Sequence, residues 1–106
     1  MGQSLSVFSS GELEYCGSKK VASASLTGIF CAKEAFIKAV SSLQGMPVFG
    51  FPDIEVRHEP NGRPYLFLRQ AISAYMSDHS LAVDLSISHT ADTAGAMVIV
   101  SSLGGV

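Results

Sequence analysis

The sequence has little charge, few cysteines and no long hydrophobic run. Only 15% of its 106 residues are charged, and a formal net charge of -2 with a pI near 5.8 leaves no broad basic surface. Nucleic acid and anionic membrane are therefore not expected as partners. The longest apolar run, Ala94 to Val100, is far shorter than the ~20 residues that a membrane-spanning helix requires. The N-terminus also lacks the charged start and apolar stretch of a signal peptide, so we expect a cytoplasmic protein.

The two cysteines, Cys16 and Cys31, provide neither a disulfide framework nor the spacing of metal ligands. We expect both to be reduced, buried and used as small apolar side chains. Hydrophobic residues make up 47% of the chain, which suffices for one modest core, so residues 1–106 are expected to form a single domain. The mean hydropathy of +0.33 is high for this size, and some apolar side chains are expected to face a partner subunit.

The first half of the sequence predicts two helices. Ser9 and Glu12 have the spacing of a capping box, in which each side chain bonds the backbone amide of the other, and a short helix should follow to about Lys20. A longer helix is expected from residue 23 or 25 to residue 43, because apolar residues recur there at intervals of three and four. The predicted core-facing stripe consists of Leu26, Ile29, Phe30, Ile37, Val40 and Leu43.

The second half predicts strands, turns and one further helix. Glycines and prolines between residues 45 and 52 indicate a loop, and Asn61-Gly62 indicates a hairpin turn. Residue patterns predict strands over 53–57, 65–68 and 83–88, a helix over 70–80, and a fully buried strand over the apolar segment 94–101. The element order α-α-β-β-α-β-β indicates an α+β domain with an antiparallel sheet.

Glu34 and Lys38 lie one helical turn apart inside an otherwise apolar segment of the long predicted helix. Residues four apart share a helix face, so a carboxylate that could hold a metal ion and an ammonium that could meet a phosphate point the same way. Together they indicate phosphate chemistry. The alternative is an ordinary surface pair that stabilises the helix by about 0.2–0.5 kcal/mol.

Four short segments in sequence order carry a resemblance to a known family. They are Phe8 to Cys16, Ala32 to Ala39, Asp53 to Val56 with Asn61 to Tyr65, and Leu85 to Thr90. They match the patterns F-T-x-x-E-x-x-Y-C, K-E-A, D-I-E-V with N-G-K/R-P, and S-L/I-S-H-T, with serine in place of the first threonine. In these segments the chain resembles the holo-acyl-carrier-protein synthase family, the small 4′-phosphopantetheinyl transferases. No single pattern is decisive, but four in the correct order across nearly the whole chain are specific.

The resemblance implies the 4′-phosphopantetheinyl transferase fold, with an antiparallel sheet packed against a long helix, in a homotrimer whose active sites lie between subunits. It implies that the phosphopantetheine arm of coenzyme A is transferred to a serine of an acyl carrier protein, in fatty acid or polyketide biosynthesis. The reaction would use Mg2+ and release 3′,5′-ADP. Such chemistry builds negative charge on phosphoryl oxygens, which a metal ion and a nearby cation stabilise.

The resemblance also assigns roles to individual residues. Glu34 would be the magnesium ligand, and Lys38 would meet the pyrophosphate or the leaving group. The 3′-phosphate or adenosine would meet His89 and Thr90, and the nucleotide cleft would be bounded by Asn61, Gly62 and Pro64. As alternatives, His89 could cap or pack a strand end, and Asn61-Gly62 could serve only the hairpin. His58 and His79 match no family pattern and are expected to be exposed or interfacial.

The chain departs from the family pattern at its start. Family members open with a strand whose aspartate is the other magnesium ligand, and no such strand precedes Phe8. Ile29 stands where the family has an arginine. The sequence therefore leaves three interpretations open: an active transferase, a catalytically degenerate coenzyme A-binding or structural module within a larger synthase, and a fragment of a longer product.

Overall fold

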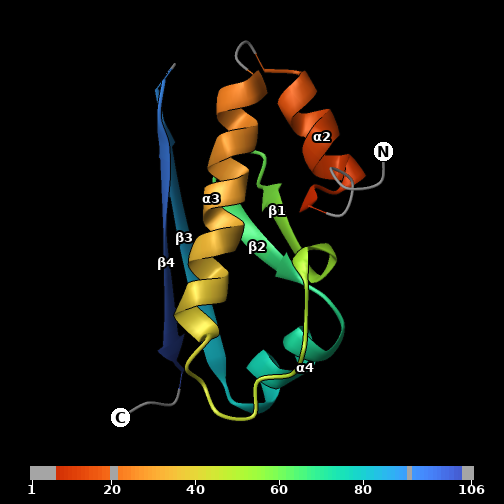
Figure 1. The fold of residues 1–106 in the computed structure, drawn as a ribbon, viewed down its shortest axis with the longest axis vertical. Helices are drawn as coiled ribbons and strands as arrows, with labels where there is room; N and C mark the ends of the chain where they lie inside the picture. Colours follow the sequence, from red (N-terminus) through yellow and green to blue (C-terminus); the bar gives the residue numbers. More distant parts are fainter. Residues whose placement is uncertain (1–6, 20–21, 91, 104–106) are drawn as a thin grey trace.

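The computed structural model describes residues 7–19, 22–90 and 92–103, and its elements follow the predicted order (Figure 1). The predicted α+β class is confirmed. A 3-10 turn, η1, covers Phe51–Asp53. The helices are α2 (Ser10–Gly17), α3 (Ala22–Val40) and α4 (Gln70–Asp78), and the strands are β1 (Ile54–His58), β2 (Pro64–Leu68), β3 (Leu81–His89) and β4 (Ala94–Ser102).

Helix α2 begins with the predicted capping box. The Ser9 hydroxyl accepts a hydrogen bond from the Glu12 amide at 3.1 Å, and Glu12 Oε1 accepts one from the Ser9 amide at 2.9 Å. These bonds satisfy two backbone donors that a helix start otherwise leaves unpaired. The helix ends at Gly17, earlier than predicted, and Lys20 lies outside the described residues.

Helix α3 runs along the molecule between α2 and the β3–β4 hairpin (Figure 1). The predicted stripe is right for Ile29 and Val40, which are buried, and wrong for Phe30, which is 40% exposed. Small residues face the sheet instead. A Cβ added to Gly28 would lie 2.9 Å from Ile87 Cγ2, closer than real contacts, so glycine allows β3 to approach the helix.

The strands form two antiparallel hairpins rather than one continuous hydrogen-bonded sheet. In the first, β1 pairs with β2 from Ile54↔Leu68 to His58↔Pro64, and the predicted Asn-Gly turn contains Gly62 at φ 92°. In the second, β3 pairs with β4 from Leu81↔Ser102 to His89↔Ala94. The ends of β1 and β3 therefore carry His58 and His89, each beside a turn.

Strand β4 is not fully buried as the sequence predicted. Its side chains alternate between half-buried and exposed, and Met97 and Ile99 are 62% and 54% exposed. The reason is that α3 covers one face of the β3–β4 hairpin, and no described element covers the other. The continuous apolar run thus supplies both an inner face and an unusually apolar outer face.

The core consists of two clusters of buried side chains along α3. One surrounds Phe36 and includes the predicted α4 residues Ile72, Tyr75 and Met76, which are confirmed as buried. The other surrounds Ile29 and includes Cys16. Among the helices of the described residues, none has the length and apolarity needed to cross a membrane. The cytoplasmic location itself stays a prediction.

Candidate functional site

Glu34 and Lys38 line an open groove beside α3, about 500 Å³ in volume, which we call the Glu34 groove. Glu34 is half-buried and Lys38 is exposed. Among the described residues neither side chain takes part in an ion pair, so the alternative of a mutual stabilising pair does not describe this arrangement. Both charges remain available for a ligand. The residues that line the groove are Phe30, Cys31, Glu34, Ala35, Lys38 and Ala96.

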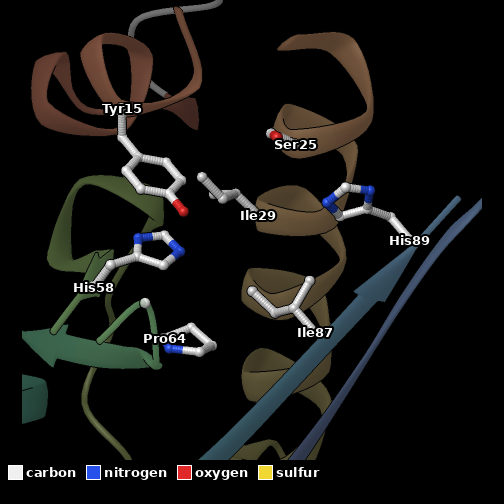
Figure 2. A pocket seen from close by; sticks show the side chains of 8 residues that line it. Tyr15, Ser25, Ile29, His58, Pro64, Ile87 and His89 are labelled. Atoms are coloured by element: carbon white, nitrogen blue, oxygen red, sulfur yellow. The ribbon is translucent and has the colours of Figure 1, made fainter. Parts of the chain in front are cut away.

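A second and smaller cavity, about 170 Å³, lies where the β1–β2 turn approaches the ends of α3 and β3; we call it the hairpin pocket. It brings together three of the predicted nucleotide residues, Gly62, Pro64 and His89. Figure 2 shows Tyr15 and His58 on one side of this pocket, with Ser25, Ile87 and His89 on the other. Its lining is Tyr15, Ser25, Ile29, His58, Gly62, Pro64, Ile87 and His89.

Thr90 and Asn61 lie next to this pocket but shape turns. The Thr90 hydroxyl accepts hydrogen bonds from the amides of Asp92 and Thr93, at 3.2 and 3.1 Å. The Asn61 side-chain oxygen accepts one from the Arg63 amide at 3.0 Å. Both patterns are local side-chain turns that hold a hairpin connection in shape. Their contact with the nucleotide stays a prediction. The hydrogen bonds of both side chains stabilise hairpin turns.

His58 was not predicted as a site residue, although it lines the pocket. Its ring stacks on Tyr15 with centroids 3.7 Å apart and an interplanar angle of 8°. Burial and the positive charge of Lys19 lower the pKa of His58 below its usual value, so the imidazole is neutral near pH 7. The sequence around His58 could not indicate this position, because the pocket forms only where Tyr15 of α2 packs against the end of β1.

Lys33, directly before Glu34 in sequence, has a structural role. Its ammonium is fully buried and donates hydrogen bonds to Glu12 Oε1 at 2.8 Å and to the Val7 carbonyl at 2.6 Å. Glu12 Oε2 also accepts a bond from the Val56 amide at 2.6 Å. The pair therefore ties α2, α3 and β1 together, and a buried charge pair of this kind needs every one of these partners.

The groove and the pocket lie on different sides of α3 and share no residue. Ile29 lines the pocket and Glu34 lines the groove; five residues along a helix of 3.6 residues per turn correspond to a rotation of roughly 140°. A single chain consequently separates the residues predicted for the metal and pyrophosphate from those predicted for the nucleotide.

The described residues contain no cluster of three or more histidine, cysteine or acidic side chains that could hold a metal ion. The donor set of the groove is one carboxylate, Glu34. Mg2+ is commonly bound by one or two carboxylates together with water and substrate phosphates, so Glu34 fits this ion as a ligand that acts with a bound phosphate.

Comparison with known proteins agrees with this architecture. The sequence profile of the 4′-phosphopantetheinyl transferase superfamily matches residues 4–93, and the chain belongs to this superfamily. The holo-acyl-carrier-protein synthase of Syntrophus aciditrophicus is 39% identical over 100 residues, which cover 92% of this chain and 76% of that protein. The resemblance found in the sequence is thereby confirmed.

Solved structures show the same fold. The complex of ACPS with CoA from Chronobacterium ammoniagenes has a TM-score of 0.79 at 31% identity, over 94% of this chain and 81% of that one. The holo-acyl-carrier-protein synthase of Helicobacter pylori, solved with coenzyme A, has a TM-score of 0.70 at 30% identity, over 91% and 78% of the two chains.

Proposed function

We propose that this chain transfers the 4′-phosphopantetheine arm of coenzyme A to a serine of an acyl carrier protein. The observation that carries the proposal is the convergence of Gly62, Pro64 and His89 on one pocket in a member of the 4′-phosphopantetheinyl transferase superfamily. The Glu34 groove supports it, since Lys38 offers a cation to a pyrophosphate and Glu34 a carboxylate that could hold Mg2+ beside it, and neither is paired among the described residues.

In this reaction the serine hydroxyl of the carrier attacks the phosphorus that bears the pantetheine arm. The bond from that phosphorus to the bridging oxygen breaks, 3′,5′-ADP leaves with the bonding electrons, and the hydroxyl proton passes to solvent. Lys38 is proposed to hold the pyrophosphate oxygens and to stabilise the charge on the departing phosphate. Glu34 is proposed to hold Mg2+, which when bound neutralises part of that charge.

We further propose that protomers assemble so that the Glu34 groove of one meets the hairpin pocket of another, as in the expected trimer. Two features support this proposal. The groove and the pocket lie on different sides of α3 within one chain. The outer face of β4 also presents Met97 and Ile99, and exposed apolar patches are typical of protein interfaces.

The decisive test is to incubate the protein with coenzyme A, Mg2+ and several apo carrier proteins, and to measure the added arm by mass spectrometry. We expect modification that requires Mg2+ and falls about 100-fold or more in Glu34→Gln, which corresponds to about 2.7 kcal/mol of lost transition-state stabilisation. Glu14→Gln, an exposed carboxylate on α2, is the matched control. Coenzyme A binding that needs no Mg2+, without modification of any carrier, would instead identify the degenerate binding module.

Shared active sites can be tested by complementation. Glu34→Gln and His89→Ala are each expected to be inactive alone, and their co-expression should restore part of the activity if one protomer supplies Glu34 and its neighbour supplies His89. Co-expressed variants that stay as inactive as either alone would place both residues in one protomer and contradict the assembly.

A further inference from the structure

Strand β4 has one edge without a backbone partner among the described residues. It pairs with β3 along one side, and Figure 1 shows it as the outermost strand of the molecule. Helix α3 packs on one face of the β3–β4 hairpin and leaves the far edge of β4 uncovered. An open strand edge presents a row of amide donors and carbonyl acceptors to any extended chain that approaches it.

Hydrogen bonds at the ends of the hairpin show which residues of β4 face away from β3. The Thr90 amide donates to the Thr93 carbonyl at 2.8 Å, and at the other end the Leu103 amide donates to the Ser80 carbonyl at 2.7 Å. Bonded and non-bonded pairs alternate along an antiparallel ladder, so every second residue of β4 directs both its amide and its carbonyl to the free edge. In the middle of the strand these residues are Ala96, Val98 and Val100.

The free edge of β4 lacks the features that usually protect an edge, which are charged residues, proline and bulges. The strand Ala94–Ser102 contains no charged residue and no proline, and its register with β3 is continuous. The β1–β2 hairpin differs, because the Val56 amide, which faces away from β2, is bonded by the Glu12 carboxylate at 2.6 Å. The chain therefore closes β1 at this point and leaves β4 open for pairing.

The Glu34 groove borders this open edge. Ala96 lines the groove, and the Cys31 thiol on α3 donates to the Ala94 carbonyl at 3.8 Å. A strand paired with β4 directs alternate side chains toward α3 and toward the outer face of the hairpin. The inward side chains would meet the apolar part of the groove, which is formed by Phe30 and Ala35.

We propose that the free edge of β4 binds an extended segment of another polypeptide by strand addition. Main-chain hydrogen bonds supply the affinity, and apolar side chains at every second position supply the fit. The outward side chains of the segment extend the apolar face that carries Met97 and Ile99, and the inward ones form a wall of the Glu34 groove. A second copy fits this edge less well, because two paired β4 strands would place both Glu34 grooves against each other and away from any hairpin pocket.

The test uses a short peptide of alternating valine and threonine, with every second amide methylated so that one edge alone can pair. Hydrogen exchange of the protein amides then reports where the peptide binds. We expect exchange at Ala96, Val98 and Val100 to slow about tenfold or more, because their amides gain partners. The amides of Met97 and Ile99 already bond β3 and should change little.

The matched control is the same peptide with every amide methylated, which keeps the side chains but cannot donate hydrogen bonds, and it should protect none of these amides. Val98→Pro removes an outward amide without removing a bond to β3, and it should weaken binding of the first peptide about tenfold. If this variant does not fold, the two peptides on the unaltered protein still decide the question.

Equal binding of the two peptides, or no protection of the β4 amides by the first, would overturn the inference. Protection of the three amides in the protein alone would do so as well, because the chain itself or a second copy would then cover the edge. Exchange is measured without coenzyme A or a carrier protein. Failure of strand addition therefore leaves the proposed transfer reaction untouched, and failure of transfer leaves strand addition untouched.

Discussion

Charged side chains on the two sides of helix α3 have opposite environments, although the residues concerned are near one another in sequence. Lys33 is fully buried, paired with Glu12 and bonded to backbone. Glu34 and Lys38 line an open groove and pair with nothing among the described residues. A helix turns by about 100° per residue, which is enough to take adjacent residues into different environments.

The K-E-A segment therefore combines two separate roles, since one charge stabilises the fold and the other is available to a ligand. Through Glu12, the buried Lys33 ties α2, α3 and β1 together. Because its ammonium is already paired, it cannot also bind a substrate. The half-buried Glu34 carboxylate and the exposed Lys38 ammonium face an open groove, where solvent weakens their contribution to folding, and both are free to bind a ligand. Stability and chemistry should consequently be separable by mutation along a single helix.

The largest effect is expected from Lys33→Met, which leaves the Glu12 carboxylate buried without its cation. Unfolding free energy should fall by about 3–5 kcal/mol, measured by urea denaturation, because the charge of Glu12 stays out of water unpaired. Lys38→Met, on the exposed side of the same helix, should change it by less than about 0.5 kcal/mol. Equal losses in the two variants would erase the distinction between the two sides.

A double variant sharpens this result. Glu12→Gln combined with Lys33→Met removes both charges and keeps one side-chain oxygen, which can accept the hydrogen bond of either the Ser9 amide or the Val56 amide. It should recover at least half of the stability that Lys33→Met loses. If the double variant is no better than the single one, the packing of the lysine stem matters more than its charge.

The converse variant, Lys38→Gln, should damage transfer and spare folding. We expect kcat to fall about 30-fold, which corresponds to about 2 kcal/mol, because a cation near the developing phosphate charge is lost. The thermal midpoint should stay within about 1 °C, and Lys38→Arg should restore much of the rate. A loss of stability that accounts for the lost rate would contradict the proposed division.

Much of the fold was predictable because its signals are local. The Ser9 and Glu12 spacing, the Asn61-Gly62 turn and the alternation of the strands each depend on a few neighbouring residues, and each prediction is confirmed within a few residues of its expected bounds. The predictions that failed, the full burial of β4 and the core stripe of α3, depend on tertiary packing. The predicted stripe assigns only large apolar residues to the core face of α3, whereas Gly28 faces the sheet because it permits close approach.

The candidate site was predicted in part for the same reason. Glu34 and Lys38 could be placed on one face from their spacing alone, whereas His89 was proposed as a site residue only through the family resemblance. His58 could not, because its role as a pocket residue depends on Tyr15, which reaches it from another element. The burial of Lys33 was equally hidden, since its partner Glu12 lies 21 residues earlier and looked like a helix cap only.

The smallest expected effect is a dependence of stability on acid pH that arises from Glu55, which lies beside the buried pair of Lys33 and Glu12 and bonds Ser9. Burial alone would raise the pKa of Glu55, but hydrogen bonds from Ser9 and Arg57 and the charges of Arg57 and Arg69 together lower it below its usual value. A lowered pKa in the folded state means that the ionised group stabilises the fold above its unfolded pKa, near 4.3, and that this stabilisation disappears as pH falls through the folded value.

Glu55→Gln should therefore be less stable than the unaltered protein by about 1 kcal/mol between pH 5 and 7, because the two arginine partners are about 40% exposed and each pair contributes modestly. The difference should shrink toward zero as pH falls through the lowered pKa of Glu55, where its carboxyl becomes protonated in the folded state. Denaturation midpoints across this range measure it, and Glu14→Gln, which changes an exposed carboxylate on α2, should show no such pH dependence. A difference that stays constant with pH would mean that Glu55 stabilises the fold by its shape and hydrogen bonds. The distinction between charges paired inside the fold and the unpaired charges of the Glu34 groove would then not extend beyond Lys33.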